Sequence, residues 1–185
     1  PELEGEIKEM LRKWEDGDKE TLQLWKKING WALKGFEETY KTFGIAFDKF
    51  YNESVHYIDG RNIVLEAYKK GLLKKDEKGN IMIELKKYGM PDKILLRADG
   101  TSIYITQDIN LARLKQQDFR MDKSIYIVGS EQILHFKQLF KILQLLKIYS
   151  GETYHLAHGM VYLPEGKMKS REGRVVDADN LVDEM

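Results

Sequence analysis

The chain has 185 residues, 30 of them basic and 30 acidic, so its formal net charge at pH 7 is zero. This length suits one ordinary domain or part of a larger one, and the balanced charge excludes a chain that grips nucleic acid by its own electrostatics. The sequence has no cysteine and no apolar run long enough to cross a bilayer, which excludes disulfide frameworks, thiolate chemistry and membrane spans, and we expect a cytoplasmic protein.

Two helices are predicted at the start of the chain. Residues 2–14 and 20–43 both carry apolar side chains at three- and four-residue steps, which is typical of amphipathic helices. Aromatic residues at this spacing belong to protein cores far more often than to ligand sites. We therefore interpret Trp25, Trp31 and Phe36 as packing residues.

Short elements follow these helices. Residues 45–47 alternate like a short strand. A turn at Asp59-Gly60 precedes a predicted helix over residues 62–70. Residues 71–87 predict two strands joined by a turn in which glycine and asparagine stand side by side, a pair that favours a hairpin.

From residue 93 onward, strands alternate with helices. Thr106 can cap one of the helices, with Asp108 in its first turn, and the strand SIYIV is apolar enough to be buried in a parallel sheet. The predicted elements are strand 94–97, helix 106–117, strand 124–128, helix 131–149, strand 155–163 and a helix from 177. This order predicts an α/β fold with parallel strands and right-handed crossovers.

Tyr104 and Asp108 lie four residues apart near a predicted helix start, just past a strand. In an open parallel sheet, ligands bind in front of the carboxyl ends of the strands. An aromatic ring with a carboxylate suits a cation, most of all a planar guanidinium that pairs bidentately. A capping aspartate beside a half-buried tyrosine is the alternative, and the spacing alone leaves both open.

Residues 158–175 combine a short strand with a glycine-edged loop that carries Lys167, Lys169, Arg171 and Arg174. Opposed charge and accessible backbone suit a polyphosphate, although a solvated basic loop fits the same residues. We expect no metal site in the neighbouring HLAH, because three-residue spacing on a strand sends the two imidazole rings to opposite faces and no third ligand is near.

Four phrases occur in a recognisable order: FDKFYNES, LLRADGTSIYITQDIN, IYIVGSEQ and HGMVYLPEGKMKSREG. Together they resemble the arginyl-tRNA synthetases, a class I family, and GKMKSREG is similar to the form that the KMSKS signature takes there. The resemblance implies that Tyr104, Asp108 and Gln132 hold the substrate arginine. His135, one turn after Gln132, would line the same crevice.

The same resemblance implies an ATP site. It comprises His158, Gly159 and Met160 at the adenine, and Lys167 with its neighbours Lys169, Ser170 and Arg171 at the phosphates. Three positions depart from the usual family pattern: Gln107 replaces arginine, Lys169 replaces a small residue and Glu172 replaces a common lysine. The two departures in the loop leave open which amine meets which phosphate.

We accordingly expect an internal piece of such a synthetase. Residues 1–92 would be a helical insertion with a small hairpin, and residues 93–185 the second half of the Rossmann-like nucleotide-binding catalytic domain. The implied reaction joins L-arginine to ATP, which carries Mg²⁺, and then transfers the arginyl group to tRNA(Arg). No structural metal is expected.

Because the sequence shows no HIGH-like segment, we expect the isolated chain to be inactive without the remaining synthetase domains. Two alternatives stay open. One is a synthetase-derived module that binds a ligand or a partner without catalysis. The other is an unrelated nucleotide-binding scaffold, which would show no preference for arginine over lysine.

Overall fold

The computed structural model describes residues 2–160, 162–163, 166–167 and 176–185. The chain divides into two compact units. The first comprises residues 1–49 together with 168–185, and the second comprises residues 50–167.

The first unit is helical, with α1 (Glu2–Glu15), α2 (Lys19–Thr42) and α6 (Ala178–Asp183). Asp18 caps α2, because its carboxylate accepts a hydrogen bond from the backbone N–H of Thr21 at 2.9 Å. The Thr39 hydroxyl donates to the Asp179 carboxylate at 2.9 Å and so links α2 to α6. The two predicted N-terminal helices are thus confirmed.

The aromatic stripe on α2 does not form a core within the described part of the chain. Trp31 is 62% exposed and Phe36 57% exposed, so the interpretation of these two as packing residues is wrong for this chain. Trp25 is partly buried and contacts the Trp14 ring at a centroid distance of 5.9 Å. Apolar periodicity predicts which face of a helix can be buried, but burial also needs a second surface to cover that face.

Residues 45–47, near the end of the first unit, form no strand, so the strand predicted there is wrong. The second unit begins with an irregular segment at residues 50–52. Helix α3 (Glu53–Lys69) follows and runs straight through Asp59 and Gly60, so the predicted turn there is wrong. Gly60 is buried where α3 crosses the next helix: a Cβ at this position would lie 2.5 Å from the backbone oxygen of Thr106. The glycine therefore serves a close helix–helix approach.

A three-stranded antiparallel sheet comes next, with β1 (Lys74–Lys75), β2 (Ile81–Ile83) and β3 (Lys93–Leu96) in that order. The hairpin between β1 and β2 was predicted and is confirmed. Strand β3 pairs antiparallel with β2, so its prediction as the first parallel strand is wrong. The connection between β2 and β3 contains only a short 3-10 helix, η1 (Lys86–Tyr88), which is too short for a parallel crossover.

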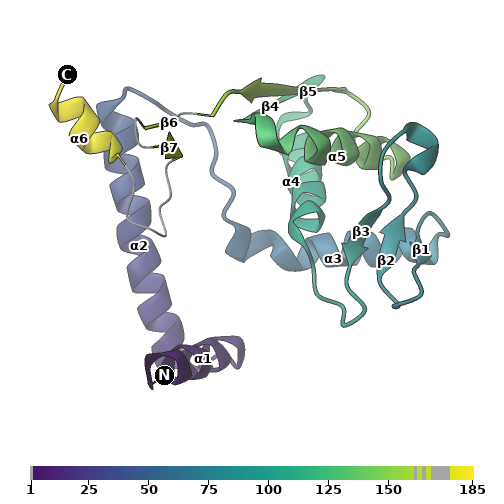
Figure 1. Cartoon of the computed structure of the whole chain (residues 1–185), viewed down its shortest axis with the longest axis horizontal. Coiled ribbons are helices and arrows are strands. Elements are labelled where there is room, and N and C mark those ends of the chain that lie inside the picture. Colours follow the sequence, from purple (N-terminus) through teal and green to yellow (C-terminus); the bar gives the residue numbers. More distant parts are fainter. Residues whose placement is uncertain (1, 161, 164–165, 168–175) are drawn as a thin grey trace. The chain divides into compact units, whose positions relative to one another are not determined.

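The remaining elements form a small α/β layer. They are α4 (Tyr104–Phe119), β4 (Lys123–Gly129), η2 (Ser130–Gln132), α5 (Ile133–Leu145) and β5 (Glu152–His158). Strands β4 and β5 are parallel, as predicted, and α5 forms the crossover between them. Helices α4 and α5 lie on the same face of this strand pair (Figure 1).

The opposite face of the pair carries exposed apolar side chains. Ile125 and Ile127 of β4 stand in register with Tyr154 and Leu156 of β5, and all four are about half exposed or more. The expectation that SIYIV is buried on both faces is therefore wrong among the described residues. The predicted strand 155–163 is divided into β5 and β6 (Tyr162–Leu163), and β6 pairs antiparallel with β7 (Gly166–Lys167).

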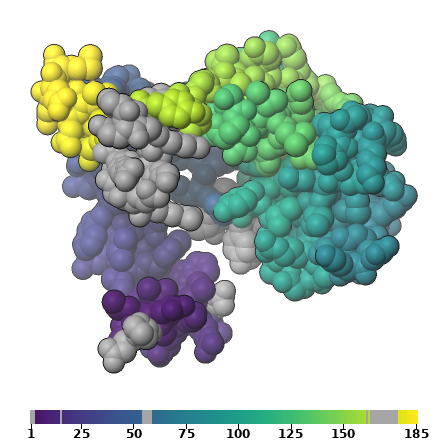
Figure 2. Space-filling view, in the orientation of Figure 1, coloured from purple at the N-terminus to yellow at the C-terminus, as the bar shows by residue number. Residues whose placement is uncertain are grey.

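The hydrophobic core of the chain lies in the second unit. In Figure 2, the teal atoms of the hairpin region and the green atoms of α4, β4 and α5 form one continuous mass. The core residues come from α3, the antiparallel sheet, α4 and α5, and the fully buried large side chains include Val64, Leu85, Leu95, Ile105, Ile109, Leu139, Ile142 and Leu143. The α/β class is confirmed.

Candidate functional site

Helix α4 is held in place at its first turn by Thr106. This residue is fully buried, its hydroxyl donates a hydrogen bond to the carbonyl of Leu95 in β3, and it accepts one from the backbone N–H of Ile103 at 3.3 Å. The helix begins at Tyr104, so Thr106 is its third residue and not the predicted cap. Asp108 consequently lies in the second turn, one turn later than predicted.

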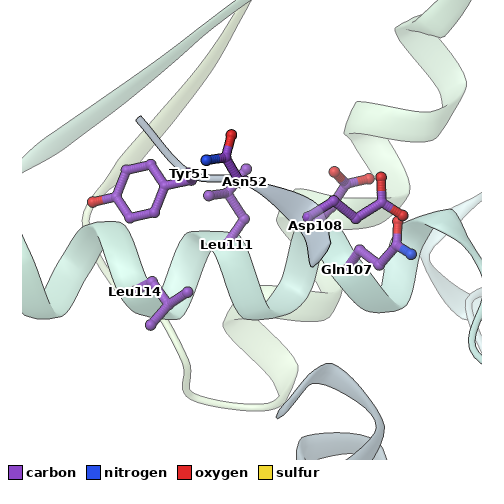
Figure 3. A pocket seen from close by; sticks show the side chains of 7 residues that line it. Tyr51, Asn52, Gln107, Asp108, Leu111 and Leu114 are labelled. Atoms are coloured by element: carbon purple, nitrogen blue, oxygen red, sulfur yellow. The ribbon is translucent and has the colours of Figure 1, made fainter. Parts of the chain in front are cut away.

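A pocket lies between α4 and the segment that leads into α3. Two of its lining residues, Tyr51 and Asn52, come from that segment, Glu53 is the first residue of α3, and four come from α4: Gln107, Asp108, Leu111 and Leu114. It encloses about 140 Å³, well above the roughly 10–15 Å³ that one water needs. Asp108 and Gln107 lie at one end, and Tyr51 and Leu114 at the other (Figure 3).

The pocket favours a cation. Two of its seven lining residues, Glu53 and Asp108, carry carboxylates, and none of the seven is basic. A positively charged group that enters therefore meets two opposite charges, while an anion would be repelled. The flat end groups of Asn52 and Gln107 add donors and acceptors that can orient such a group.

Tyr51 fixes the far wall of the pocket. Its hydroxyl donates a hydrogen bond to the Asp118 carboxylate at 2.6 Å, which ties the segment before α3 to the last turn of α4. Burial, together with this bond to a carboxylate, raises the pKa of Tyr51 to about 12. The phenol thus stays protonated and keeps its bond throughout the physiological range.

Asp108 also contacts α5. Nε2 of His135 lies 2.7 Å from Oδ2 of Asp108. The sequence predicted that His135 lines the arginine crevice, but it did not predict this contact. Further along α4, the Lys115 amine lies 4.0 Å from the centroid of the Tyr126 ring. Burial lowers the pKa of Lys115, and the charge of Asp108 acts in the opposite direction.

The other two residues expected at the arginine lie outside the pocket lining. Tyr104, one turn before Asp108 on α4, is 82% exposed. Gln132, at the end of η2 and one turn before His135, is exposed as well. The structure therefore brings Asp108 and His135 together and places Tyr104 and Gln132 one helical turn away from them.

The residues expected at the adenine lie at the end of β5. His158 is exposed, and its Nδ1 donates to the carbonyl of Gly159 at 3.0 Å. Among the described residues, no atom beyond the chain neighbours of Gly159 lies within 4 Å of the place where its Cβ would stand, so these residues leave the backbone there accessible. His155 uses its Nε2–H to donate to the Val128 carbonyl at 2.9 Å, and its ring packs against the ring of Phe136.

Most of the residues expected at the ATP phosphates lie outside the described part of the chain. The backbone of Lys167 belongs to β7, but its side chain is not described. Lys169, Ser170 and Arg171 lie outside the described residues. Their assignment to the ATP phosphates stays a prediction.

Sequence reasoning missed several residues of the pocket wall. Leu111 and Leu114 follow Gln107 and Asp108 at three- to four-residue steps, so helical spacing alone could have placed them on the same side of α4. Tyr51 gave no such signal. Its segment is irregular, and periodicity gives no direction for a side chain outside a helix or strand.

Comparisons with known proteins agree with this fold. All 185 residues match a family described as "tRNA synthetases class I (R), catalytic domain". The chain is therefore part of a class I aminoacyl-tRNA synthetase catalytic domain.

Relatives at high identity specify the family further. The chain is 52% identical over 181 residues to the arginine–tRNA ligase of Amoebophilus asiaticus, covering 97% of this chain and 30% of that protein. It is 51% identical over 184 residues to the arginine–tRNA ligase of Parabacteroides distasonis, covering 99% of this chain and 31% of that protein. The chain belongs to the arginyl-tRNA synthetase family, and it spans about three tenths of the length of these relatives.

Two solved structures share the fold. The arginyl-tRNA synthetase of Plasmodium falciparum superimposes with a TM-score of 0.77 at 20% identity, covering 99% of this chain and 30% of that one. A putative arginyl-tRNA synthetase from Campylobacter jejuni gives 0.74 at 22% identity, covering 91% and 37%. At identities of 20% and 22%, these similarities support the fold and no more than the fold.

No helix among the described residues has the length and apolar character needed to cross a membrane. In the same part of the chain, no three His, Cys, Asp or Glu side chains converge on one point as a metal site requires.

Proposed function

We propose that the protein to which this chain belongs is an arginine–tRNA ligase. It joins L-arginine to ATP as arginyl-adenylate with release of pyrophosphate, and then transfers the arginyl group to tRNA(Arg). Family membership along the whole chain supports this proposal. The observation that carries it is Asp108, a carboxylate in a pocket without a basic lining residue.

Asp108 would receive the guanidinium of arginine. A carboxylate and a guanidinium can form two parallel hydrogen bonds, a geometry that a lysine ammonium cannot reproduce. The ring of Tyr104 and the amide of Gln132, both exposed and one turn from the Asp108–His135 pair, are available to flank the substrate. The pocket thus suits arginine better than other basic amino acids.

ATP would bind past the end of β5. The accessible backbone of Gly159, between His158 and Met160, suits close approach by an adenine ring. Lys167 would neutralise the phosphates, with Lys169, Ser170 and Arg171 beside it. Positioning and charge neutralisation would then drive an in-line attack of the arginine carboxylate on the α-phosphate, a reaction that needs no protein nucleophile.

Mg²⁺ would enter with ATP. No three carboxylate or imidazole side chains come together among the described residues. The nucleotide phosphates are the usual ligands in such a case. No step proposed above depends on the ion.

We also infer how the chain divides within the parent protein. Residues 93–185 would form the second half of the Rossmann-like catalytic domain, and the parallel pair β4–β5 with its crossover helix α5 lies wholly within them. Residues 1–92 would form the insertion, although β3 pairs with β2 across that boundary. The parent would act in the cytoplasm, and the chain by itself would lack activity without the remaining domains.

Asp108→Asn in the full-length protein tests the assignment. We expect the KM for arginine to rise by roughly 1.5 to 3.5 orders of magnitude, the equivalent of about 2–5 kcal/mol for leaving a buried cation unpaired, while the KM for ATP changes little. Asp122→Asn, a change at an exposed acid between α4 and β4, is the control. If arginine-dependent exchange of pyrophosphate into ATP is absent from the parent protein itself, the proposed function is wrong.

A further inference from the structure

The carboxylate of Asp108 is held by a residue from another helix. His135 Nε2 lies 2.7 Å from Asp108 Oδ2, although the two residues are 27 positions apart in the chain. Both side chains are largely covered, with 20% of His135 and 33% of Asp108 exposed. The contact therefore joins the second turn of α4 to the first turn of α5 at the edge of the pocket.

The geometry fixes the donor. A carboxylate can only accept hydrogen bonds, so the Nε2 atom of His135 must carry the proton and donate it to Oδ2. The carboxylate has two oxygens and about four lone pairs in all. One bond at Oδ2 therefore leaves the group able to accept a bidentate guanidinium.

The imidazole ring is itself supported. Its edge meets the ring of Phe136 at a centroid distance of 5.4 Å and an angle of 86°. Phe136 is buried and contacts Tyr126 on β4 and His155 on β5. The orientation of His135 is thus connected through packed rings to the parallel strand pair.

We propose that His135 is a positioning residue for arginine: it sets the plane of the Asp108 carboxylate so that both oxygens meet the guanidinium. This inference rests on the proposed function, because it requires arginine to be the ligand of Asp108. An unsupported aspartate can rotate about its side-chain bonds and would have to lose that freedom when arginine binds. His135 removes this entropic cost in advance.

Two substitutions separate positioning from packing. His135→Phe keeps an aromatic ring against Phe136 but removes the N–H. His135→Gln removes the ring but places an amide N–H at a similar reach. If His135 positions Asp108, the phenylalanine variant should bind arginine weakly and the glutamine variant should bind it nearly as well as the parent. If His135 only packs, the glutamine variant should be the weaker of the two.

The experiment measures steady-state pyrophosphate exchange with the full-length protein, varying arginine and ATP separately. We expect His135→Phe to raise the KM for arginine roughly 10- to 100-fold, the range for losing a hydrogen bond to a charged group, with the KM for ATP within about threefold of the parent. His135→Gln should restore at least half of that loss on a logarithmic scale. An arginine KM for His135→Phe within threefold of the parent, or equal losses for arginine and ATP, would overturn the proposal.

A double variant completes the test. If His135 acts through Asp108, then His135→Phe should cost little more once Asp108→Asn is present, because the carboxylate that it orients is gone. Fully additive losses would show that His135 acts by another route and would also overturn the proposal. Failure of the inference remains distinct from failure of the proposed function: in the latter case the parent protein shows no arginine-dependent exchange at all.

Discussion

Gly60→Ala is the substitution for which the structure makes the sharpest prediction about stability. In α3 the residue is helical and buried, and alanine normally stabilises a helix by about 1 kcal/mol relative to glycine. At this position, however, the new Cβ would lie 2.5 Å from the backbone oxygen of Thr106, whereas real Cβ atoms essentially never come within 3.0 Å of such an atom. The sign of the effect therefore depends on whether α3 and α4 can move apart.

They cannot separate without cost. The atom in the way belongs to the backbone of α4, so no side-chain rotation relieves the clash, and the hydroxyl of Thr106 holds that turn to β3. Overpacking of a filled contact costs about 1–3 kcal/mol. After the gain in helix propensity is subtracted, we expect Gly60→Ala to destabilise the protein by about 1 kcal/mol, and by no more than about 2 kcal/mol.

Gly30→Ala is the matched control. It makes the same chemical change in α2, where no atom of the described residues, apart from the nearby backbone of the helix itself and the adjacent residues, lies within 4 Å of the new methyl group, so it should stabilise that helix by about 1 kcal/mol. Hydrogen exchange resolved by peptide reads α2 and α3 separately, which avoids treating two compact units as one unfolding transition. Faster exchange in α3 for Gly60→Ala and slower exchange in α2 for Gly30→Ala are expected. Equal or slower exchange in α3 would refute the close-contact argument.

Three further predictions concern other contacts of the second unit. The backbone N–H groups of Leu85 and Lys86 donate to Asp92 and lower its pKa. Asp92→Asn should therefore reduce the free energy of unfolding at pH 7. In urea titrations, the difference between variant and parent should vanish as the pH falls through the folded-state pKa of Asp92. The pKa of Tyr51 is raised to about 12, so its hydrogen bond should stabilise the fold below about pH 10, and this stabilisation should be lost as the pH rises to about 12. The ultraviolet absorbance of phenolate should show an ionisation step near pH 12 that Tyr51→Phe removes. Leu139→Ala, at a fully buried position, should cost about 2–5 kcal/mol in chemical denaturation, and a loss under 1 kcal/mol would mean that the core there is loosely packed.

Elements with strong local signals could be predicted from the sequence. Helices α1 and α2, the β1–β2 hairpin and the parallel pair β4–β5 all follow from periodicity or turn residues, which act within a few positions of the chain. The family phrases also placed Asp108 and His135 near the same substrate, although they did not predict the contact between the two side chains. These predictions needed no knowledge of distant contacts.

The errors arose where a distant contact decides the outcome. Gly60 looks like a turn residue by local rules, but its lack of a side chain is used for helix packing against Thr106, 46 positions further on. Strand β3 looks like the start of an α/β alternation, but it pairs with β2, which precedes it by a short connection. The stripe on α2 predicts burial, yet amphipathicity cannot say what covers Trp31 and Phe36.

The position of Asp108 depends on the same contact that the glycine substitution probes. Thr106 lies half a turn before Asp108 on α4. Its hydroxyl donates a hydrogen bond to β3, and α3 packs against its backbone carbonyl at Gly60. The segment that forms the other wall of the pocket leads directly into α3. We therefore expect a displacement of α3 from α4 to widen the pocket as well as to weaken the fold. Leu139, by contrast, is a buried residue of α5 that does not line the pocket. We therefore expect Gly60→Ala to lower both stability and arginine affinity, and Leu139→Ala to lower stability alone. This pair of outcomes would show that the placement of the candidate site depends on one buried helix crossing.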